Sequence, residues 1–73
     1  MPKFAIGDTI KTMSEVKVRQ GPAKSSALLG TRSAGAVGTV ADGPVLDTVP
    51  SPDIVYWKIA EFGGWVGEDK LRQ

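Results

Sequence analysis

Apolar and polar residues alternate in short runs along most of the chain, and this two-residue period is typical of half-buried β-strands. The clearest runs are residues 16–19, 37–40, 55–59 and 65–66. Helical spacing of apolar residues is confined to the stretch 5–16, where threonine and glycine favour a strand over a helix. The pattern therefore predicts an all-β fold, either a small barrel or a sandwich.

Glycine, proline and small polar residues mark the turns between these runs. Gly21-Pro22 ends the strand before it, because proline has no N–H for a central strand. Residues 33–35 form a tight turn in which Gly35 takes a positive φ. The proline-bearing segment 42–53 is predicted to be the longest exposed loop. Residues 62–65 look like a hairpin turn, and residues 67–71 suit one helical or 3₁₀ turn.

Alternation within each run also predicts which side chains face the core. Val16 and Val18 share one side of their strand, so they are expected to be buried while Lys17 and Arg19 face water. Arg19 could instead fold over the end of the barrel and bond to loop carbonyls. The expected centre of the core is Val16, Val18, Leu29, Val37, Val40, Ile59, Val66 and Leu71.

Composition narrows the class of protein. The 73 residues (7.7 kDa) form one small domain, and the chain has no cysteine and no histidine. Disulfides, ordinary zinc sites and Cys or His catalysis are therefore excluded. No apolar run approaches the roughly 20 residues of a membrane span, and residues 1–4 do not resemble a signal peptide. We expect a non-enzymatic module without a cofactor. Its localisation stays open: it would be extracellular or in the cell envelope if the chain is part of an exported protein, and cytoplasmic otherwise.

Charge is divided unevenly along the chain. Residues 1–34 hold six Lys and Arg against two Asp and Glu, a net +4, and residues 35–73 hold three against six, a net −3. This division could create a basic binding face or could cancel where early strands pair with late ones. The second interpretation is favoured, because nucleic-acid-binding domains usually carry a larger positive excess than the overall +1.

Four sequence boxes in order resemble the bacterial SH3 domain family. They are residues 16–30 (Val-Lys-Val-Arg-Gln-Gly-Pro through Leu-Leu-Gly), 35–40, 56–59 (Tyr-Trp-Lys-Ile) and 64–71 (Gly-Trp-Val through Leu), and the resemblance covers residues 8–71. It implies an SH3-like barrel of five to six short strands with a terminal 3₁₀ turn. It also implies a binding module that recognises peptidoglycan, cell-wall peptide or another envelope ligand.

The aromatic residues are the best candidates for ligand contact, because aromatic rings combine large rigid area with a polar group. In the run 55–59, Trp57 is expected to point inward and Tyr56 outward, while Trp65 could approach the same strand. Tyr56, Trp57 and Trp65 are therefore candidate ligand-binding residues, with Asp53 as a polar partner. The alternative is that both tryptophans simply close the ends of a small barrel.

Other functions stay open. A protein–protein adaptor or homo-oligomer could use Leu28 and the apolar positions 45, 46 and 49, unless these pack their loop onto the barrel. Nucleic-acid binding by a stripe of Lys11, Lys17 and Arg19 is less favoured, because no aromatics interleave with these cations. No metal site is expected, since Asp47 and Asp53 do not have EF-hand spacing.

Overall fold

The computed structural model describes residues 3–47 and 54–73, which form seven β-strands and two 3₁₀ turns. The strands are β1 (Thr9–Thr12), β2 (Val16–Arg19), β3 (Leu28–Arg32), β4 (Val37–Asp47), β5 (Ile54–Ile59), β6 (Gly64–Gly67) and β7 (Leu71–Arg72). The 3₁₀ turns are η1 (Ala60–Phe62) and η2 (Glu68–Lys70). The all-β prediction and the terminal 3₁₀ turn are confirmed, and no described helix is long and apolar enough to cross a membrane.

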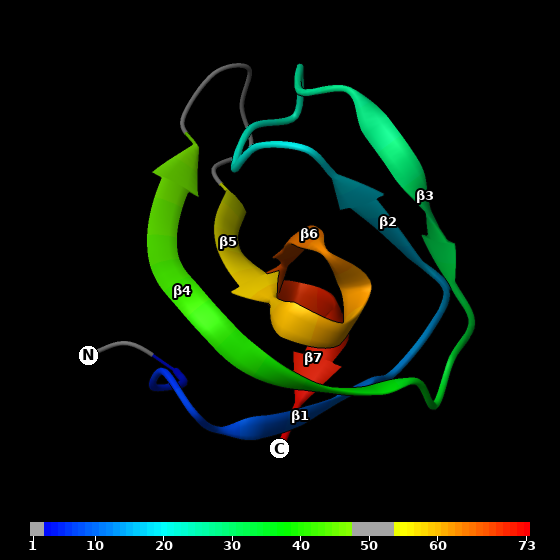
Figure 1. Cartoon of the computed structure of the whole chain (residues 1–73), viewed down its shortest axis with the longest axis vertical. Helices are drawn as coiled ribbons and strands as arrows, with labels where there is room; N and C mark the ends of the chain where they lie inside the picture. Colours follow the sequence, from blue (N-terminus) through cyan, green and yellow to red (C-terminus); the bar gives the residue numbers. More distant parts are fainter. Residues whose placement is uncertain (1–2, 48–53) are drawn as a thin grey trace.

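All seven strands belong to one antiparallel sheet in the order β3-β2-β6-β5-β4-β1-β7. Figure 1 shows β4 curving along one side of the molecule and β2 and β3 along the other, with β5 and β6 between them. The edge strands β3 and β7 do not pair with each other in the described part of the chain, so the sheet is not closed. The strand count is one above the expected upper limit, because the two-residue β7 is too short to detect from alternation.

The expected loop at residues 42–47 is wrong, because β4 continues through Gly43 and Pro44 to Asp47. Relative to β5, strand β4 has one extra residue between Val40 and Asp42 and another between Asp42 and Val45. An extra residue on one strand of a pair is a β-bulge. A bulge accommodates proline because the missing N–H is not needed for the ladder. The Gly43–Pro44 peptide bond is cis, and Gly43 has a φ of 119° beside the Trp57 ring, where a side chain would not fit. Residues 48–53 of the expected loop lie outside the described residues.

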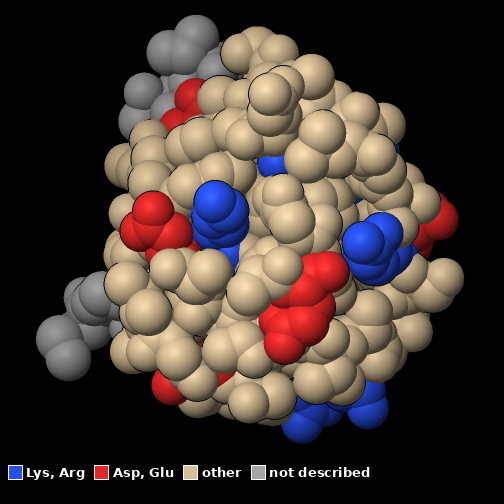
Figure 2. Space-filling model, in the orientation of Figure 1, with Lys and Arg blue, Asp and Glu red and all other residues tan. Residues whose placement is uncertain are grey.

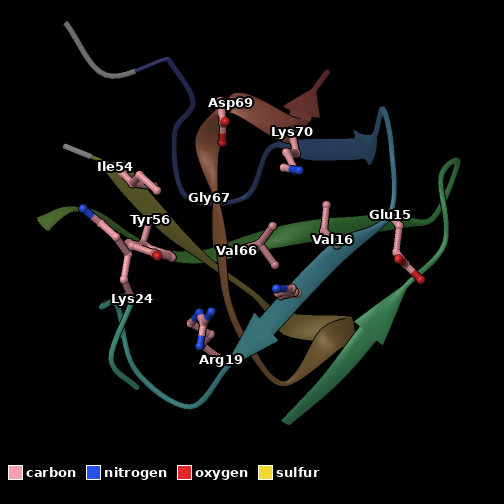
Figure 3. Close-up of a pocket in the computed structure, with 11 residues that line it drawn as sticks. Glu15, Val16, Arg19, Lys24, Ile54, Tyr56, Val66, Gly67, Asp69 and Lys70 are labelled. Carbon is pink, nitrogen blue, oxygen red and sulfur yellow. The ribbon is translucent and has the colours of Figure 1, made fainter. Parts of the chain in front are cut away.

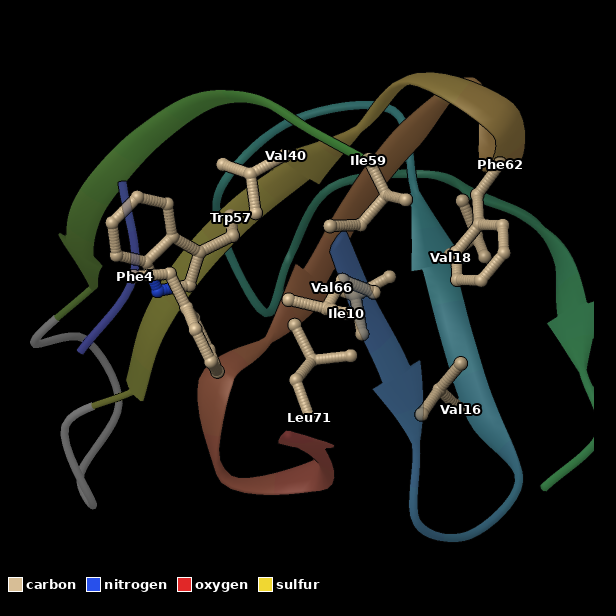
Figure 4. Close-up of a cluster of buried hydrophobic side chains, with 10 residues drawn as sticks. All are labelled: Phe4, Ile10, Val16, Val18, Val40, Trp57, Ile59, Phe62, Val66 and Leu71. Carbon is tan, nitrogen blue, oxygen red and sulfur yellow. The ribbon is translucent and has the colours of Figure 1, made fainter. Parts of the chain in front are cut away.

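Ten side chains form the buried core: Phe4, Ile10, Val16, Val18, Val40, Trp57, Ile59, Phe62, Val66 and Leu71 (Figure 4). Six of the eight predicted core residues are among them. The expectation is wrong for Leu29 and Val37, whose side chains are 54% and 57% exposed. Val37 lies three residues from Val40, so the two cannot face the same side of a regular strand. Gly38 takes the inward position instead, directly against Ile59.

Local interactions fix the connections between strands. Gly35 has the predicted positive φ of 86° in the turn between β3 and β4. The buried Thr12 hydroxyl donates to the Ser33 carbonyl (2.8 Å) and accepts from the Ala36 N–H (2.9 Å), which ties β1 to this turn. The predicted hairpin between β5 and β6 is built from η1 and Gly63, which has a φ of 72°. The chain therefore reverses direction there through a 3₁₀ turn.

Candidate binding groove

Strands β2 and β6 meet at one register position, Arg19 opposite Trp65, within the described residues. Beyond this position the strands separate, because β6 leads into η2 while β2 continues back toward residue 15 (Figure 3). The opening between them is a cavity of about 350 Å³, which we call the β2–β6 groove. Its lining residues are Glu15, Val16, Lys17, Arg19, Lys24, Ile54, Tyr56, Val66, Gly67, Asp69 and Lys70.

The groove combines an apolar floor with a charged rim. Val16 and Val66 belong to the core and also line the groove, so the core lies directly beneath its floor. Around this floor lie four cationic and two acidic side chains, Lys17, Arg19, Lys24, Lys70, Glu15 and Asp69. An apolar surface with a few charged groups is the usual character of a small-ligand site. A volume near 350 Å³ corresponds to the small end of the range for such sites.

Tyr56 and Arg19 lie together at one end of the groove (Figure 3). Tyr56 on β5 is opposite Gly67 on β6, and a Cβ at Gly67 would press on Asp69 Oδ1 and Ile54 Cγ2, two other residues of the groove. The Arg19 guanidinium donates to the Ser26 carbonyl (3.0 Å) and is hydrogen-bonded to the Tyr56 side chain. The alternative, in which Arg19 bonds to a loop carbonyl instead of facing water, is therefore confirmed.

Burial is the main influence on the acidity of Tyr56. Tyr56 is only 4% exposed, and its removal from water raises the pKa of the hydroxyl above the ordinary value of 10.0. The nearby Arg19 charge and hydrogen bond oppose this change, while Asp47 and Asp69 add to it. Because burial dominates, Tyr56 is neutral at physiological pH and presents a hydroxyl group to its surroundings.

The segment between β2 and β3 supplies Lys24, which closes the same end of the groove. Its backbone N–H donates to the Asp47 carboxylate at 2.7 Å, so the end of β4 holds this segment in place. The contact joins a residue of the basic first part of the chain to one of the acidic second part. The donor is a neutral main-chain N–H, so the contact fixes the position of the segment.

The structure places the predicted ligand contacts in different environments. Tyr56 lines the groove, and although it lies outside the core cluster, it is buried rather than solvent-facing. Trp57 points inward as predicted, is 1% exposed, and donates from Nε1 to Glu68 Oε2 (2.8 Å). Trp65 is half-buried on β6 and does not line the groove. Asp53 lies outside the described residues.

Trp57 belongs to the buried core and does not line the groove. Its ring meets Phe4 edge to face, with ring centroids 5.7 Å apart (Figure 4). The groove instead uses charged residues that the aromatic criterion overlooked, above all Lys24 and Lys70. Their approach depends on how β2 and β6 diverge, and the sequence contains no local signal for that divergence.

Charged side chains on the face shown in Figure 2 are scattered among uncharged ones. Lys and Arg are separated there by uncharged surface and by carboxylates, so no continuous basic stripe crosses this face. Among the described residues, no group of three or more acidic side chains is arranged to hold a metal ion. Comparison with known proteins finds no family model, curated protein or solved structure that matches this chain.

Proposed function

We propose that the protein is a non-catalytic binding module that holds a short peptide segment in the β2–β6 groove. The observation that carries this proposal is the divergence of β2 and β6 around an open cavity with both an apolar floor and a charged rim. A peptide offers matching chemistry, because it carries small apolar side chains, main-chain hydrogen-bonding groups and charges. The volume suits a few residues of such a chain.

The curled sheet is proposed to be an SH3-like barrel of the bacterial type. The order of the four sequence boxes supports this assignment, as does the antiparallel sheet with a 3₁₀ turn before its last strand. The ligand class that follows from the resemblance is cell-wall peptide, peptidoglycan or another envelope polymer. The groove lies between the segment that carries Lys24 and η2, so the ligand would contact β2, β6 and these two segments.

A second candidate function is a protein–protein adaptor or a homo-oligomer. Leu28 and Leu46 are 52% and 56% exposed, and Val45 is also exposed on β4. Because β4 is a strand here, Val45 and Leu46 do not fold a loop onto the barrel. Light scattering over a concentration series would show association if this surface joins copies of the chain, and Leu46→Ser should weaken it. Nucleic-acid binding is less supported, given the dispersed charges of Figure 2.

The direct test is a titration of the ¹⁵N-labelled protein with soluble peptidoglycan fragments, followed by amide chemical shifts and tryptophan fluorescence. We expect the largest shifts at Lys17, Val66 and Gly67, which border the groove, and little change at Val37 on β4, which does not line it. Ile54→Ser, at a half-buried apolar residue of the groove lining, should weaken binding, and Val37→Ser on the exposed surface outside the groove is the control. Absence of any shift at millimolar fragment would refute the proposal.

A further inference from the structure

Building on the proposed function, we propose that the β2–β6 groove binds its peptide as an added β-strand, whose main chain pairs with the free edge of β2 at Lys17. Main-chain amides, rather than charges, are then the chemistry that the groove recognises. The ligand is an extended peptide that runs antiparallel to β2, in the place that β6 would occupy if it continued alongside β2 (Figure 3).

The main-chain groups of β2 alternate between its two neighbouring strands. Gln20 donates its N–H to the Ala27 carbonyl on the β3 side (2.8 Å). The Arg19 carbonyl lies on the β6 side, since a Cβ at Gly64 would meet that oxygen at 2.6 Å. Successive residues of a strand direct their N–H and C=O groups to opposite sides. Lys17, two residues before Arg19, therefore directs both groups toward β6 and away from β3.

Lys17 has no strand beside it on that side. Within the described residues, β2 meets β6 at one register position, Arg19 opposite Trp65, and β6 ends at Gly67, where η2 begins. Lys17 borders the groove that opens between the two strands. An unpaired strand edge is a template for another extended chain. The edge of β2 therefore offers one main-chain donor and one acceptor to a ligand in the groove.

A peptide strand at this place would continue an interface that is already part of the fold. The two strands are antiparallel where they meet, so a peptide that runs in the direction of β6 extends the same ladder along β2. Its residue opposite Lys17 exchanges two hydrogen bonds with β2. The side chain of the next residue, opposite Val16, lies on the same face as Val16, over the apolar floor. A cavity of about 350 Å³ accommodates small side chains at that position.

The charges around the groove are mixed, which favours a neutral main chain over an ion. Arg19 and Lys70 line the groove together with Glu15 and Asp69. Arg19 and Asp69 also act in opposite directions on the pKa of Tyr56, so the two charges share one end of the groove. A ligand of either charge therefore meets like charges as well as opposite ones. A sugar chain lacks amides at the spacing of a strand and does not supply the pairing.

Amide hydrogen exchange tests the free edge directly. Thr31 on β3 is opposite Lys17, so by the same alternation both residues direct their N–H groups away from the β2–β3 ladder. Both amides should exchange faster than that of Val18, which faces β3. Addition of acetyl-Ala-Ala-Ala amide should slow the exchange of Lys17 and leave Thr31 unchanged. A Lys17 amide that is as protected as Val18 in the free protein would overturn the inference.

A second peptide separates main-chain pairing from other contacts. It is the same tripeptide with every alanine nitrogen methylated, which removes the main-chain donors and keeps the carbonyl groups and the zero net charge. Both peptides are titrated into the ¹⁵N-labelled protein while the amide shifts of the groove residues are followed. We expect the methylated peptide to bind about tenfold more weakly, because its hydrogen bond to the Lys17 carbonyl is lost.

Three variants assign the effect to the edge of β2. Lys17→Pro removes the N–H and should weaken binding of the unmethylated peptide about tenfold. Lys17→Ala keeps the N–H and should stay within about twofold of the wild type. Thr31→Pro is the matched control, the same change at the opposite position of the hairpin, and should bind like the wild type. Urea unfolding checks the fold of each variant. If Lys17→Pro does not fold, amide exchange and the methylated peptide decide the question with the unaltered protein.

Equal affinity for the two peptides would overturn the added strand and leave the binding module standing. Binding by Lys17→Pro as tight as by Lys17→Ala would do the same. If peptidoglycan fragments shift the groove residues but the unmethylated tripeptide does not, this inference fails while the proposed function stands. If neither fragments nor tripeptide shift them, both fail.

Discussion

Replacing Gly64 with alanine tests the close approach of β6 to β2, on which the position of the groove depends. A Cβ atom at this position would lie 2.6 Å from the Arg19 carbonyl oxygen and 2.7 Å from Val18 Cγ1. The main-chain oxygen cannot rotate away, so β2 itself must shift. Overpacking of this kind costs about 1–3 kcal/mol, and alanine in a strand recovers about 0.5–1 kcal/mol of backbone entropy. We expect Gly64→Ala to lower the free energy of unfolding by about 1–2 kcal/mol.

Gly30→Ala is the matched control, because a Cβ at Gly30 on the neighbouring β3 would meet nothing within 4 Å. This variant should be neutral or slightly more stable than the wild type. Urea unfolding followed by tryptophan fluorescence measures both, and the comparison requires equal dependence on urea in all three proteins. For a domain of this size, the loss in Gly64→Ala corresponds to a melting temperature lower by roughly 5–15 °C. Equal stability of the two variants would refute the close β2–β6 contact.

Three further changes probe single groups. Thr12→Val should cost about 1–3 kcal/mol because the half-buried Ala36 N–H keeps only its longer bond to the Ser33 carbonyl (3.3 Å), and that carbonyl loses the Thr12 hydroxyl. Urea unfolding measures the loss, and a loss as small as that of Thr12→Ser would contradict this reasoning. Tyr56 is the chain's only tyrosine, and its hydroxyl should ionise above pH 10.0 in an ultraviolet titration. Its contribution to the free energy of unfolding is therefore complete below pH 10.0 and is lost as pH rises through the folded pKa. A titration midpoint at or below pH 10.0 would refute the burial of Tyr56. The pKa of Glu61 lies below its ordinary 4.5 because the Thr39 N–H donates to it at 2.6 Å, with the Thr39 hydroxyl adding to the effect. The stabilisation by Glu61 is therefore present above pH 4.5 and is lost as pH falls through the folded pKa. The melting temperatures of Glu61→Gln and the wild type should converge in acid. A difference in melting temperature that stays constant with pH would contradict this reasoning.

Local sequence patterns predicted the strands, but they misplaced residues where the register between two paired strands shifts. Residues 16–19 form a strand with the expected alternation, and Gly35 has the expected backbone conformation. Leu29 was misplaced because the β2–β3 register shifts between Val18 and Arg19, which leaves Leu29 as the extra residue. The loop expected after Asp42 was wrong for the same reason, since bulges carry the strand past a proline. A bulge depends on the partner strand, so a single run of residues does not reveal it.

The groove was predictable only in part. Alternation correctly placed Trp57 and Tyr56 on opposite sides of β5, and the Gly-Pro turn after β2 pointed to the role of Arg19. The sequence could not show that the side opposite the core is also buried at Tyr56, because that burial comes from Arg19 and from segments far away in the chain. Lys24 and Lys70 are 46 positions apart in the sequence and meet the same cavity only after the sheet has curled.

The single register position between β2 and β6 divides the backbone network into two unequal parts. Within the described residues, this register position is the main-chain pairing between the β2–β3 hairpin and the other five strands. The packing of Val16 and Val18 and the side-chain contacts of Arg19 with Tyr56 and of Asp47 with the Lys24 N–H complete the attachment. It can therefore open as a cooperative unit at a lower free energy than the whole domain. A ligand that spans both sides of this junction would resist that opening, so occupancy of the groove and rigidity of the hairpin would rise together.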